Sequence, residues 1–596
     1  MARCGSRVAA GVLYTAAMRS VPALTMILAV LVACGAACGQ ARNGATPDLA
    51  DIAARRSLVA ERIRLEGAGD VAGAAEINAR LAGDSMERAM RVHDAWMARR
   101  HPKTGLFPQS MTQREFNYRN TAADFFCFEL GIALDTQASS VPLLRETLAR
   151  ERALNVHNGL CVCLDWETGA QLARTGHDRM FATSEYLKDG LIGLYDRHGD
   201  AAVLARMTEL ADAIIAASAV QSRFGAIPSR ESEINGNVLQ TLCRLGFAAG
   251  RPDYFEFAGR LGEAVVEQML EAEGGTGLPL KRFDYPNDRP AVKDGTLVQL
   301  RDHGNETAVG VSEVFALAVS LRENSAWNAR AERWVEPTAR MFETILSRGV
   351  NGQGLLVNTL DARTLEPTDA APCDNWGYLL AGAILFVEAA ERQGRLPESR
   401  LEAMLASIDR VALAVTKTDG LPWEGMHHDG FADSVESALY VASRRTAVRR
   451  ALLEWADVQI GYMFKCQRPD GFVSGDYLDG NFIRTAVMYA DMRAGGFRLV
   501  PWVKGAAVGL AAGESGSVVV VLTGEPGYRG RLVPDFRRDS GRMHLPWDWS
   551  RINSWPEWAG ADVKDGPPKG MAVELGSRAK RVAPLAELGA RVWKLP

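Results

Sequence analysis

The sequence predicts a mainly α-helical fold in which six or seven helical hairpins close into an (α/α) toroid, followed by a small antiparallel β domain. Three observations predict it. A glycine-centred turn recurs through the middle of the chain, the helices between the turns alternate in character, and the composition changes near residue 496. With 47% hydrophobic and 23% charged residues among 596, the chain is globular rather than fibrous or disordered.

The first segment is typical of an export signal. Arg3, Arg7 and Arg19 precede an apolar run that reaches Ala33, and no acidic residue precedes Asp48. A basic start, an apolar core and small residues after it are the pattern of a secretory signal peptide. A transmembrane anchor is the alternative, although the run is barely long enough to span a bilayer.

The end of this segment predicts a lipoprotein. The residues Leu-Val-Ala-Cys at 31–34 resemble the lipobox of bacterial lipoproteins, in which the cysteine becomes the lipid-modified first residue of the mature chain. Cys38 is a weaker match, and an ordinary cleavage site also fits. We expect a lipoprotein-type signal peptide over 1–33, lipidation at Cys34 and a linker over 34–47. The protein would then be periplasmic or on the cell surface, with the lipid as its only contact with the membrane.

The charge of the chain excludes one class of partner. The 68 Lys and Arg against 72 Asp and Glu give a net charge of -4, and loss of the three arginines in 1–33 leaves 65 against 72, or -7. Proteins that bind nucleic acid usually carry a basic stripe or patch, so we expect no nucleic acid partner.

A short recurring element marks the helical hairpins. It consists of a glycine, a small turn or apolar residue, a brief extended stretch and the start of a helix, and its glycines lie 49 to 77 residues apart. A helix end followed by a turn favours glycine, because positive φ costs glycine little. We therefore predict the toroid over 101–496, with two or three charged amphipathic helices over 48–100 packed outside it. The glycines are Gly105, Gly176, Gly225, Gly277, Gly354, Gly420 and Gly471.

The helices between these glycines indicate which layer they occupy. Residues 307–321 and 376–387 are apolar nearly all round, whereas 400–415 places its apolar residues on one stripe. The first kind is buried on every side and the second has one face in water. A closed ring of hairpins needs an inner helix of the first kind and an outer helix of the second. An open solenoid is the alternative.

The C-terminal part predicts β structure. Short branched segments at 517–523, 531–536, 571–575 and 591–596 are separated by Gly, Pro and Asp turns, as strands are. We therefore predict a small antiparallel β domain over 497–596. Four tryptophans gather between the second and third of these segments, either as a platform for a sugar or as packing against the helices: Trp547, Trp549, Trp555 and Trp558.

Residues 100–496 resemble the six-hairpin glycosidases and toroid polysaccharide lyases. The resemblance rests on the glycine repeat and on loops such as Gly-Leu-Phe-Pro at 105–108 and Gly-Leu-Pro at 420–422. It implies a toroid that acts on carbohydrate. No catalytic residue is carried over from these families, because no catalytic signature matches position by position.

Topology predicts where the chemistry lies. If the inner helices run parallel, their N-termini and the loops that lead into them converge on one rim. The positive helix ends there would suit an acidic sugar, without excluding neutral ones. Two stretches on this rim are rich in His and carboxylates, 301–306 and 423–437, and they supply the candidate catalytic residues His303, Asp302, His427, His428, Asp429 and Asp433.

Two mechanisms remain open for these residues. Hydrolysis needs two carboxyl groups across the scissile bond, and the candidates are Asp429, Asp433, Asp302, Glu424, Asp374 and Glu306. Elimination from a uronate needs a His or Tyr base and donors for the carboxylate, and the candidates are His303, His427, His428, Tyr477, Asn305 and Arg484. Trp376 and Trp423 are further candidates for sugar binding, and Trp423 would offer a flat apolar face.

Each candidate residue would also fit a purely structural role. Asp429 or Asp433, and Asp302 or Asn305, would serve equally well as helix caps. We expect no metal and no other cofactor, because adjacent histidines such as His427 and His428 diverge and no familiar ligand spacing is present. The sequence therefore predicts an exported enzyme that cleaves glycosidic bonds in a polysaccharide or oligosaccharide, with a non-catalytic glycan-binding or scaffold lipoprotein as the alternative.

The lipoprotein prediction is tested by labelling cells with a radioactive fatty acid. The wild-type protein should incorporate the label and Cys34→Ala should not, because only the cysteine thiol can carry the lipid. Absence of label on the wild type would contradict the prediction.

Overall fold

A computed structural model describes residues 48–155, 159–272, 277–473, 480–512, 518–524 and 528–534, together with the short strands at 28–32, 571–574 and 593–594. Cys34, Tyr477 and the four clustered tryptophans lie outside the described residues.

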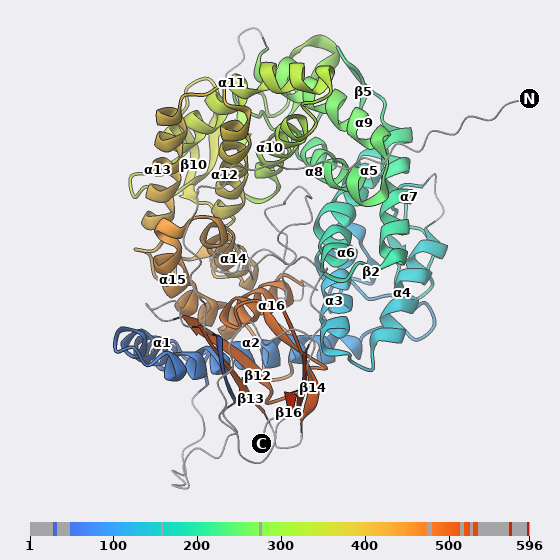
Figure 1. Cartoon of the computed structure of the whole chain (residues 1–596). Helices are drawn as coiled ribbons and strands as arrows, with labels where there is room; N and C mark the ends of the chain where they lie inside the picture. The colour runs from blue at the N-terminus through green and yellow to red at the C-terminus, as the bar shows by residue number, and fades with distance from the viewer. Residues whose placement is uncertain are drawn as a thin grey trace, which may run out of the picture.

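The described helices form a closed ring of two layers (Figure 1), so the predicted toroid is confirmed. Seven inner segments alternate with seven outer ones along the described chain, and the last inner helix packs against the first. The inner segments are η1 (Tyr118–Phe126) with α3 (Cys127–Thr136), α5 (Gly176–Glu185) with η2 (Tyr186–Leu191) and α6 (Ile192–His198), α8 (Ser232–Ala249), α10 (Glu306–Ser320), α12 (Trp376–Gln393), α14 (His428–Arg444) and α16 (Asn481–Arg493).

The outer layer encloses these inner segments. Its helices are α2 (Val71–Met97), α4 (Val141–Leu154), α7 (Ala201–Ala217), α9 (Pro252–Glu263) with η3 (Ala264–Leu270), α11 (Ser325–Arg348), α13 (Glu398–Val415) and α15 (Thr446–Lys465). A further helix, α1 (Ile52–Gly67), packs on α2 and α15. The segment 48–100 thus forms the two helices α1 and α2, and α2 lies along α16.

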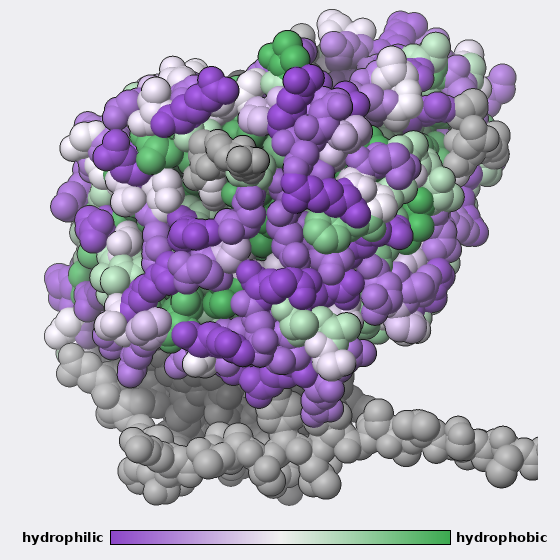
Figure 2. All heavy atoms as spheres, turned by 90° about the horizontal axis from the view of Figure 1, so that it is seen from above, coloured by the Kyte–Doolittle hydropathy of each residue, from purple (hydrophilic) through white to green (hydrophobic). Residues whose placement is uncertain are grey.

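The two layers differ in burial as their sequences predict. In α10 every residue from Glu306 to Val319 is buried, whereas α13 buries one stripe and exposes the rest. A helix between two neighbours and an outer wall has no face in water, and an outer helix keeps one. The surface seen in Figure 2 is accordingly mostly hydrophilic, with only small separate hydrophobic areas.

Most of the repeated glycines adopt the backbone that the sequence predicts. Gly105, Gly225, Gly277, Gly354, Gly420 and Gly471 have φ between 56° and 112°. Gly176 differs, because it is the first residue of α5 and Thr175 caps that helix with its hydroxyl on the Asp178 amide. In that repeat the left-handed glycines are Gly159 and Gly169, earlier in the same loop.

The connections are short on one rim of the ring and long on the other. On the short rim, residue 445 alone separates α14 from α15, and residues 199–200 separate α6 from α7. On the long rim, 271–305 leads into α10 and 349–375 leads into α12. These two loops pair through an antiparallel sheet of β8 (Leu297–Gln299), β9 (Val357–Asp361) and β10 (Pro367–Pro372). The long rim is the one at which every inner segment begins.

Glycines let neighbouring inner helices approach closely. A Cβ on Gly377 of α12 would lie 2.3 Å from the Ser437 carbonyl oxygen of α14, and one on Gly236 of α8 would lie 2.4 Å from the backbone of Glu306. No side chain fits at such distances, so these positions fix the spacing of the inner layer.

One buried carboxylate joins the two ends of the ring. Asp457 of α15 is fully buried and accepts hydrogen bonds from Arg493 Nε (2.7 Å) and Tyr489 OH (2.6 Å), both on α16. Arg62 of α1 donates to its other oxygen at 3.1 Å, and Arg55 of α1 donates to its backbone carbonyl. This cluster ties α1, which begins the described helices, to α15 and α16, which end them.

The C-terminal strands form two small, mainly antiparallel sheets beside the ring. One sheet holds β12 (Ala507–Ala512), β13 (Val518–Thr523) and β1 (Leu28–Val32). The other holds β11 (Phe497–Val500), β14 (Arg529–Pro534), β15 (Met571–Glu574) and β16 (Trp593–Lys594). Within the C-terminal part the pairs β11–β14, β12–β13 and β14–β15 are antiparallel as predicted, whereas β15–β16 is parallel, as is the pair of β13 with the N-terminal strand β1. Strand β1 lies inside the segment assigned to the signal peptide. The structure does not test that assignment, which stays a prediction.

The β12–β13 pair packs on the outside of α2. Ala75 and Ala79 of α2 form an apolar cluster with Ala511 and Val521, and Asn78 donates to the Leu510 carbonyl at 2.7 Å. Small residues on both sides let the strand pair lie close to the helix, so the β part is attached to the ring through α2.

In the part of the chain that the structure describes, no helix is long and apolar enough to cross a membrane. No two of the described cysteines form a disulfide bond, and all of them except Cys466 are buried, as expected for small apolar residues.

The close approach of α12 and α14 predicts that Gly377→Ala lowers the free energy of unfolding by about 1–3 kcal/mol, because the added methyl forces the helices apart. Gly67→Ala is the control, since its Cβ meets no atom within 4 Å and alanine favours the helix. Urea unfolding followed by circular dichroism measures both, and equal stability of the two variants would contradict the packing argument.

Candidate functional site

A cavity of about 250 Å³ opens where the inner segments begin. Side chains from η1, η2, α10, α12, α14 and α16 line it, so residues far apart in the sequence meet there. Its wall carries six carboxyl groups, from Asp124, Asp189, Glu306, Glu424, Asp429 and Asp433, and three cationic groups, from Arg119, Lys188 and Arg484. Asparagines and tyrosines complete the wall, giving a polar, anionic cavity.

A groove of about 560 Å³ adjoins this cavity. Strands β9 and β10 form one side of it, and residues 421–427 form another. Glu424 lines both the groove and the cavity, so the two are continuous at that residue. Asp374, 5% exposed, lies in the groove.

Helix α14 contributes several of the predicted residues. Its cap is His427, whose Nδ1 accepts from the Asp429 amide at 3.4 Å, so neither Asp429 nor Asp433 is the cap. Asp429 and Asp433 both line the cavity, which confirms that they share one face, and Glu436 lies one turn further along. Asn481 at the start of α16 donates to Asp429 Oδ1 at 2.6 Å.

Asp433 stands at the edge of a buried hydrogen-bond network. Tyr378 OH lies 3.0 Å from Asp433 Oδ1 and 2.7 Å from Glu436 Oε2. Glu436 is fully buried and also accepts from Arg484 Nε and Thr485 Oγ1, each at 2.6 Å. Arg484 is therefore held by Glu436 within the cavity wall.

The surroundings of Asp433 favour its protonated form. Burial comes first among the causes that raise its pKa well above the usual range, followed by the negative charge of Asp374, with smaller contributions from Glu436 and Glu424. Arg484, 3.6 Å away, opposes the shift without reversing it. A carboxyl kept neutral in this way can donate a proton at neutral pH.

A second group of charges enters the cavity from η2. This segment is a π-helix, whose wider turn commonly marks a functional site. Lys188 Nζ lies 2.6 Å from Asp189 Oδ1 and pairs with Glu306, and Gln240 donates to Glu306 at 2.6 Å. Glu306 is thus positioned by a lysine and an amide rather than acting as a cap.

The pKa of Asp189 is raised less than the pKa of Asp433. Burial raises the pKa of Asp189 to about 6, while adjacent Lys188 lowers it and Glu185 and Glu306 raise it. Tyr440 is influenced by both Asp433 and Asp189. Burial comes first among the causes that raise its pKa well above the usual range, and the carboxyls of Glu436, Asp433 and Asp189 add to it. The cavity therefore holds two buried carboxyl groups whose pKa values are raised to different extents.

Several predicted residues have structural roles instead. His428 is fully buried, with its ring centroid 4.1 Å from that of His427. Trp376 donates from Nε1 to Ser434 Oγ at 3.3 Å. Trp423 is only 2% exposed, so it does not offer the flat open face expected for stacking on a sugar. Asn305 precedes α10 and is buried, but its side chain makes no capping hydrogen bond.

Two predicted residues can be placed only by their backbone. Asp302 and His303 belong to η5 (Asp302–Asn305), a short 3₁₀ turn that leads into α10, and their side chains lie outside the described part. Tyr477 lies outside it altogether.

Seven polar residues of the cavity wall were not predicted from the sequence: Arg119, Asn120, Asp124, Lys188, Asp189, Tyr378 and Tyr440. All of them lie inside inner segments, away from the glycine loops that supplied the candidates. One signal was available for two of them, because Lys188 and Asp189, with Glu185, place three charges in the largely apolar stretch from 180 to 194.

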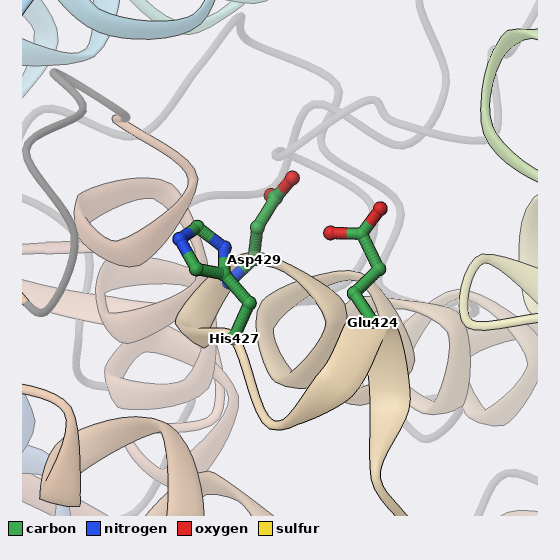
Figure 3. A group of neighbouring side chains, drawn as sticks. All are labelled: Glu424, His427 and Asp429. Atoms are coloured by element: carbon green, nitrogen blue, oxygen red, sulfur yellow. The ribbon is translucent and has the colours of Figure 1, made fainter.

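Three side chains near the cavity could hold a metal ion. In Figure 3 the carboxyl groups of Glu424 and Asp429 point the same way, and the His427 ring lies beside Asp429. One ligand atom from each lies within 4.8 Å of the other two. Glu424 has φ 43° and ψ 40°, a left-handed backbone that costs a non-glycine residue free energy, and Arg301 donates to its Oε1 at 3.0 Å.

The network beneath Asp433 predicts a large effect of Glu436→Gln. This change leaves Arg484 buried beside a neutral amide, and breaking a buried pair in this way costs about 3–5 kcal/mol. Glu454→Gln, which removes the exposed partner of Arg450, should cost less than about 1 kcal/mol. Chemical denaturation of both variants measures the difference, and similar losses would show that Glu436 and Arg484 are not coupled as described.

Comparison with known proteins gives structural neighbours only. No family model matches the chain, and no curated protein matches it. Similar solved structures include an α-1,6-mannanase from Salegentibacter sp. HEL1_6, 13% identical with a TM-score of 0.39, covering 68% of this chain and 98% of that one. Cellobiose 2-epimerase from Spirochaeta thermophila is 12% identical with a TM-score of 0.37, and covers 69% of this chain and 98% of its own.

A further neighbour is the unsaturated glucuronyl hydrolase of Bacillus sp. GL1, 12% identical with a TM-score of 0.33, covering 52% of this chain and 85% of that one. These neighbours are (α/α)-toroid carbohydrate enzymes, the group that the sequence resembles. Similarity at this level shows only the fold, so the chemistry of this chain has to be inferred from its own cavity.

Proposed function

We propose that the protein hydrolyses glycosidic bonds in a polysaccharide or oligosaccharide. The observation that carries the proposal is the pair Asp433 and Asp189, two buried carboxyl groups that line one polar cavity and whose pKa values burial raises to different extents. Acid–base hydrolysis of a glycosidic bond requires two such groups, one to give a proton and one to act on the opposite face of the sugar.

The two residues take different roles in this proposal. Asp433, whose protonated form is favoured by burial and by the charge of Asp374, would donate its proton to the glycosidic oxygen as the bond to the anomeric carbon breaks. Asp189 is mostly ionised and would either remove a proton from the attacking water or attack the anomeric carbon itself. Lys188 and Glu306 would hold the Asp189 carboxylate in place.

The charge of the cavity favours a neutral sugar over a uronate. Six carboxyl groups face three cationic groups, and two of these, Lys188 and Arg484, already pair with Glu306 and Glu436. A uronate carboxylate would meet net repulsion there. Elimination also lacks a suitable base among the described histidines of the rim, since His428 is fully buried and His427 caps α14.

The substrate class and the location belong to the same proposal. The neighbours named above act on mannan, cellobiose and unsaturated glucuronyl compounds by their names, and the asparagines and tyrosines of the cavity suit the hydroxyl groups of a sugar. We further propose that the protein is exported and anchored by a lipid at Cys34, which would place the cavity where external glycans reach it.

Incubation with a panel of neutral and uronate glycans tests the proposal. New reducing ends without ultraviolet absorbance would indicate hydrolysis, whereas unsaturated products that absorb would indicate a lyase and reject it. Glycan binding without any cleavage would favour the non-catalytic alternative.

The pair predicts two variants with distinct kinetics. Asp433→Asn should lower kcat by about 10²–10⁴-fold, because the amide cannot protonate the leaving oxygen. In the wild type, kcat/KM should rise with pH through about 6 as Asp189 loses its proton, and Asp189→Asn should abolish this acid limb together with most of the activity. Asp212→Asn, on the exposed face of α7, is the control and should keep both. A wild-type acid limb that persists in Asp189→Asn would reject Asp189 as the base.

A further inference from the structure

We propose that Glu424, His427 and Asp429 bind a divalent transition-metal ion, Zn²⁺ or Mn²⁺, at the junction of the groove and the cavity. All three lie on the loop that leads into α14 or on its first turn, and Glu424 lines both hollows. The binding of the ion is independent of the proposed hydrolysis.

The spacing of the three side chains suits a single ion. One ligand atom from each lies within 4.8 Å of the others. Zinc binds nitrogen and oxygen at about 2.0–2.2 Å, so two ligands of one ion are at most about 4.4 Å apart. Small side-chain rotations bring the three atoms into that range. Figure 3 shows the two carboxyl groups on the same side of the start of α14, the side on which the ion would bind.

The charge of the cavity, to which Glu424 and Asp429 themselves contribute, also favours a cation. Its carboxyl groups outnumber its cationic groups by six to three, and Lys188 and Arg484 are already paired deeper in the wall. The negative charges of Asp374 and Glu424 reach Asp433, where they add to the burial that raises its pKa. A divalent cation at the cluster would offset this excess of negative charge at the mouth of the cavity.

Neighbouring side chains orient two of the three ligands. Asn481 Nδ2 donates to Asp429 Oδ1 at 2.6 Å, and Arg301 donates to Glu424 Oε1 at 3.0 Å. Such outer contacts fix the direction of ligating carboxylates in metal sites. They come from α16 and from the loop before α10, so three separate parts of the ring meet at the cluster.

The types of ligand atom indicate which class of metal ion would bind. One imidazole with two carboxylates suits Zn²⁺ or Mn²⁺, whereas Ca²⁺ and Mg²⁺ prefer oxygen ligands alone. Three protein ligands leave a coordination position open, and here it would face the cavity, where water or a sugar hydroxyl completes the set. No metal was predicted from the sequence, because the adjacent His427 and His428 were expected to diverge and no familiar ligand spacing is present. The structure buries His428 and brings Glu424 beside His427 instead.

Titration of the chelator-treated full-length chain tests the proposal. Isothermal titration calorimetry with ZnCl₂ and electron paramagnetic resonance with MnCl₂ should show one ion per chain. Glu424→Gln, His427→Asn and Asp429→Asn should each weaken binding at least about tenfold. These substitutions preserve shape, and asparagine at 427 can still cap α14. Asp369→Asn removes a carboxylate from the same groove outside the cluster and should bind as the wild type does.

Equal melting temperatures of the metal-free wild type and variants would show that lost binding is not lost folding. Absence of saturable binding, unchanged affinity in all three variants, or displacement of Mn²⁺ by an equal concentration of Ca²⁺ would overturn the proposal. A chain that binds the ion but cleaves no glycan would support the metal site and reject the hydrolysis.

Discussion

One buried carboxylate, that of Asp457, fixes helix α1 to the last two helices of the ring, which itself closes where α16 packs against α2 and α3. Arg62, Tyr489 and Arg493 bring α1 and α16 onto this one group of α15, so segments about 400 residues apart in the sequence share a single hydrogen-bond centre. A buried charge is tolerated only when it is fully paired. The helices around Asp457 must therefore be in register before its desolvation is compensated, which couples the two ends of the ring.

Closure also creates the chemical environment of the cavity. Because each inner helix has neighbours on both sides and an outer helix behind it, polar groups at its N-terminal end are removed from water. Burial is accordingly the first cause of the raised pKa values of Asp433 and Asp189. The same packing that excludes side chains at Gly377 and Gly236 thus sets the protonation of the carboxyl groups. The packing of the inner helices therefore affects both the stability of the fold and the chemistry of the cavity.

Glycine placement and helix character were sufficient to predict the ring and the rim that bears the site. They reflect local backbone and burial requirements that a sequence displays directly, as Gly105 and Gly420 show. Two or three helices over 48–100 were expected outside the ring, whereas α2 of this segment is one of its outer helices. The parallel strand pairs were not predicted, because strand direction depends on which segments meet in space.

The candidate site was predictable only in part. Asp429 and Asp433 could be placed on one face because they lie four residues apart on a helix. Lys188 and Asp189 could not, because a π-turn changes the direction of side chains without any mark in the sequence. The roles of His427 and Trp423 depended on burial and capping, which residue type alone does not fix.

The unequal lengths of the connections on the two rims have a consequence for how such a protein can diverge. Residue 445 and the pair 199–200 leave the short rim no freedom to lengthen without disturbing helix packing, whereas 271–305 and 349–375 carry small sheets of their own. Insertions and exchanges in the long loops would reshape the groove while the inner helices keep their spacing. Evolution or engineering could therefore retune ligand preference one loop at a time on an unaltered frame.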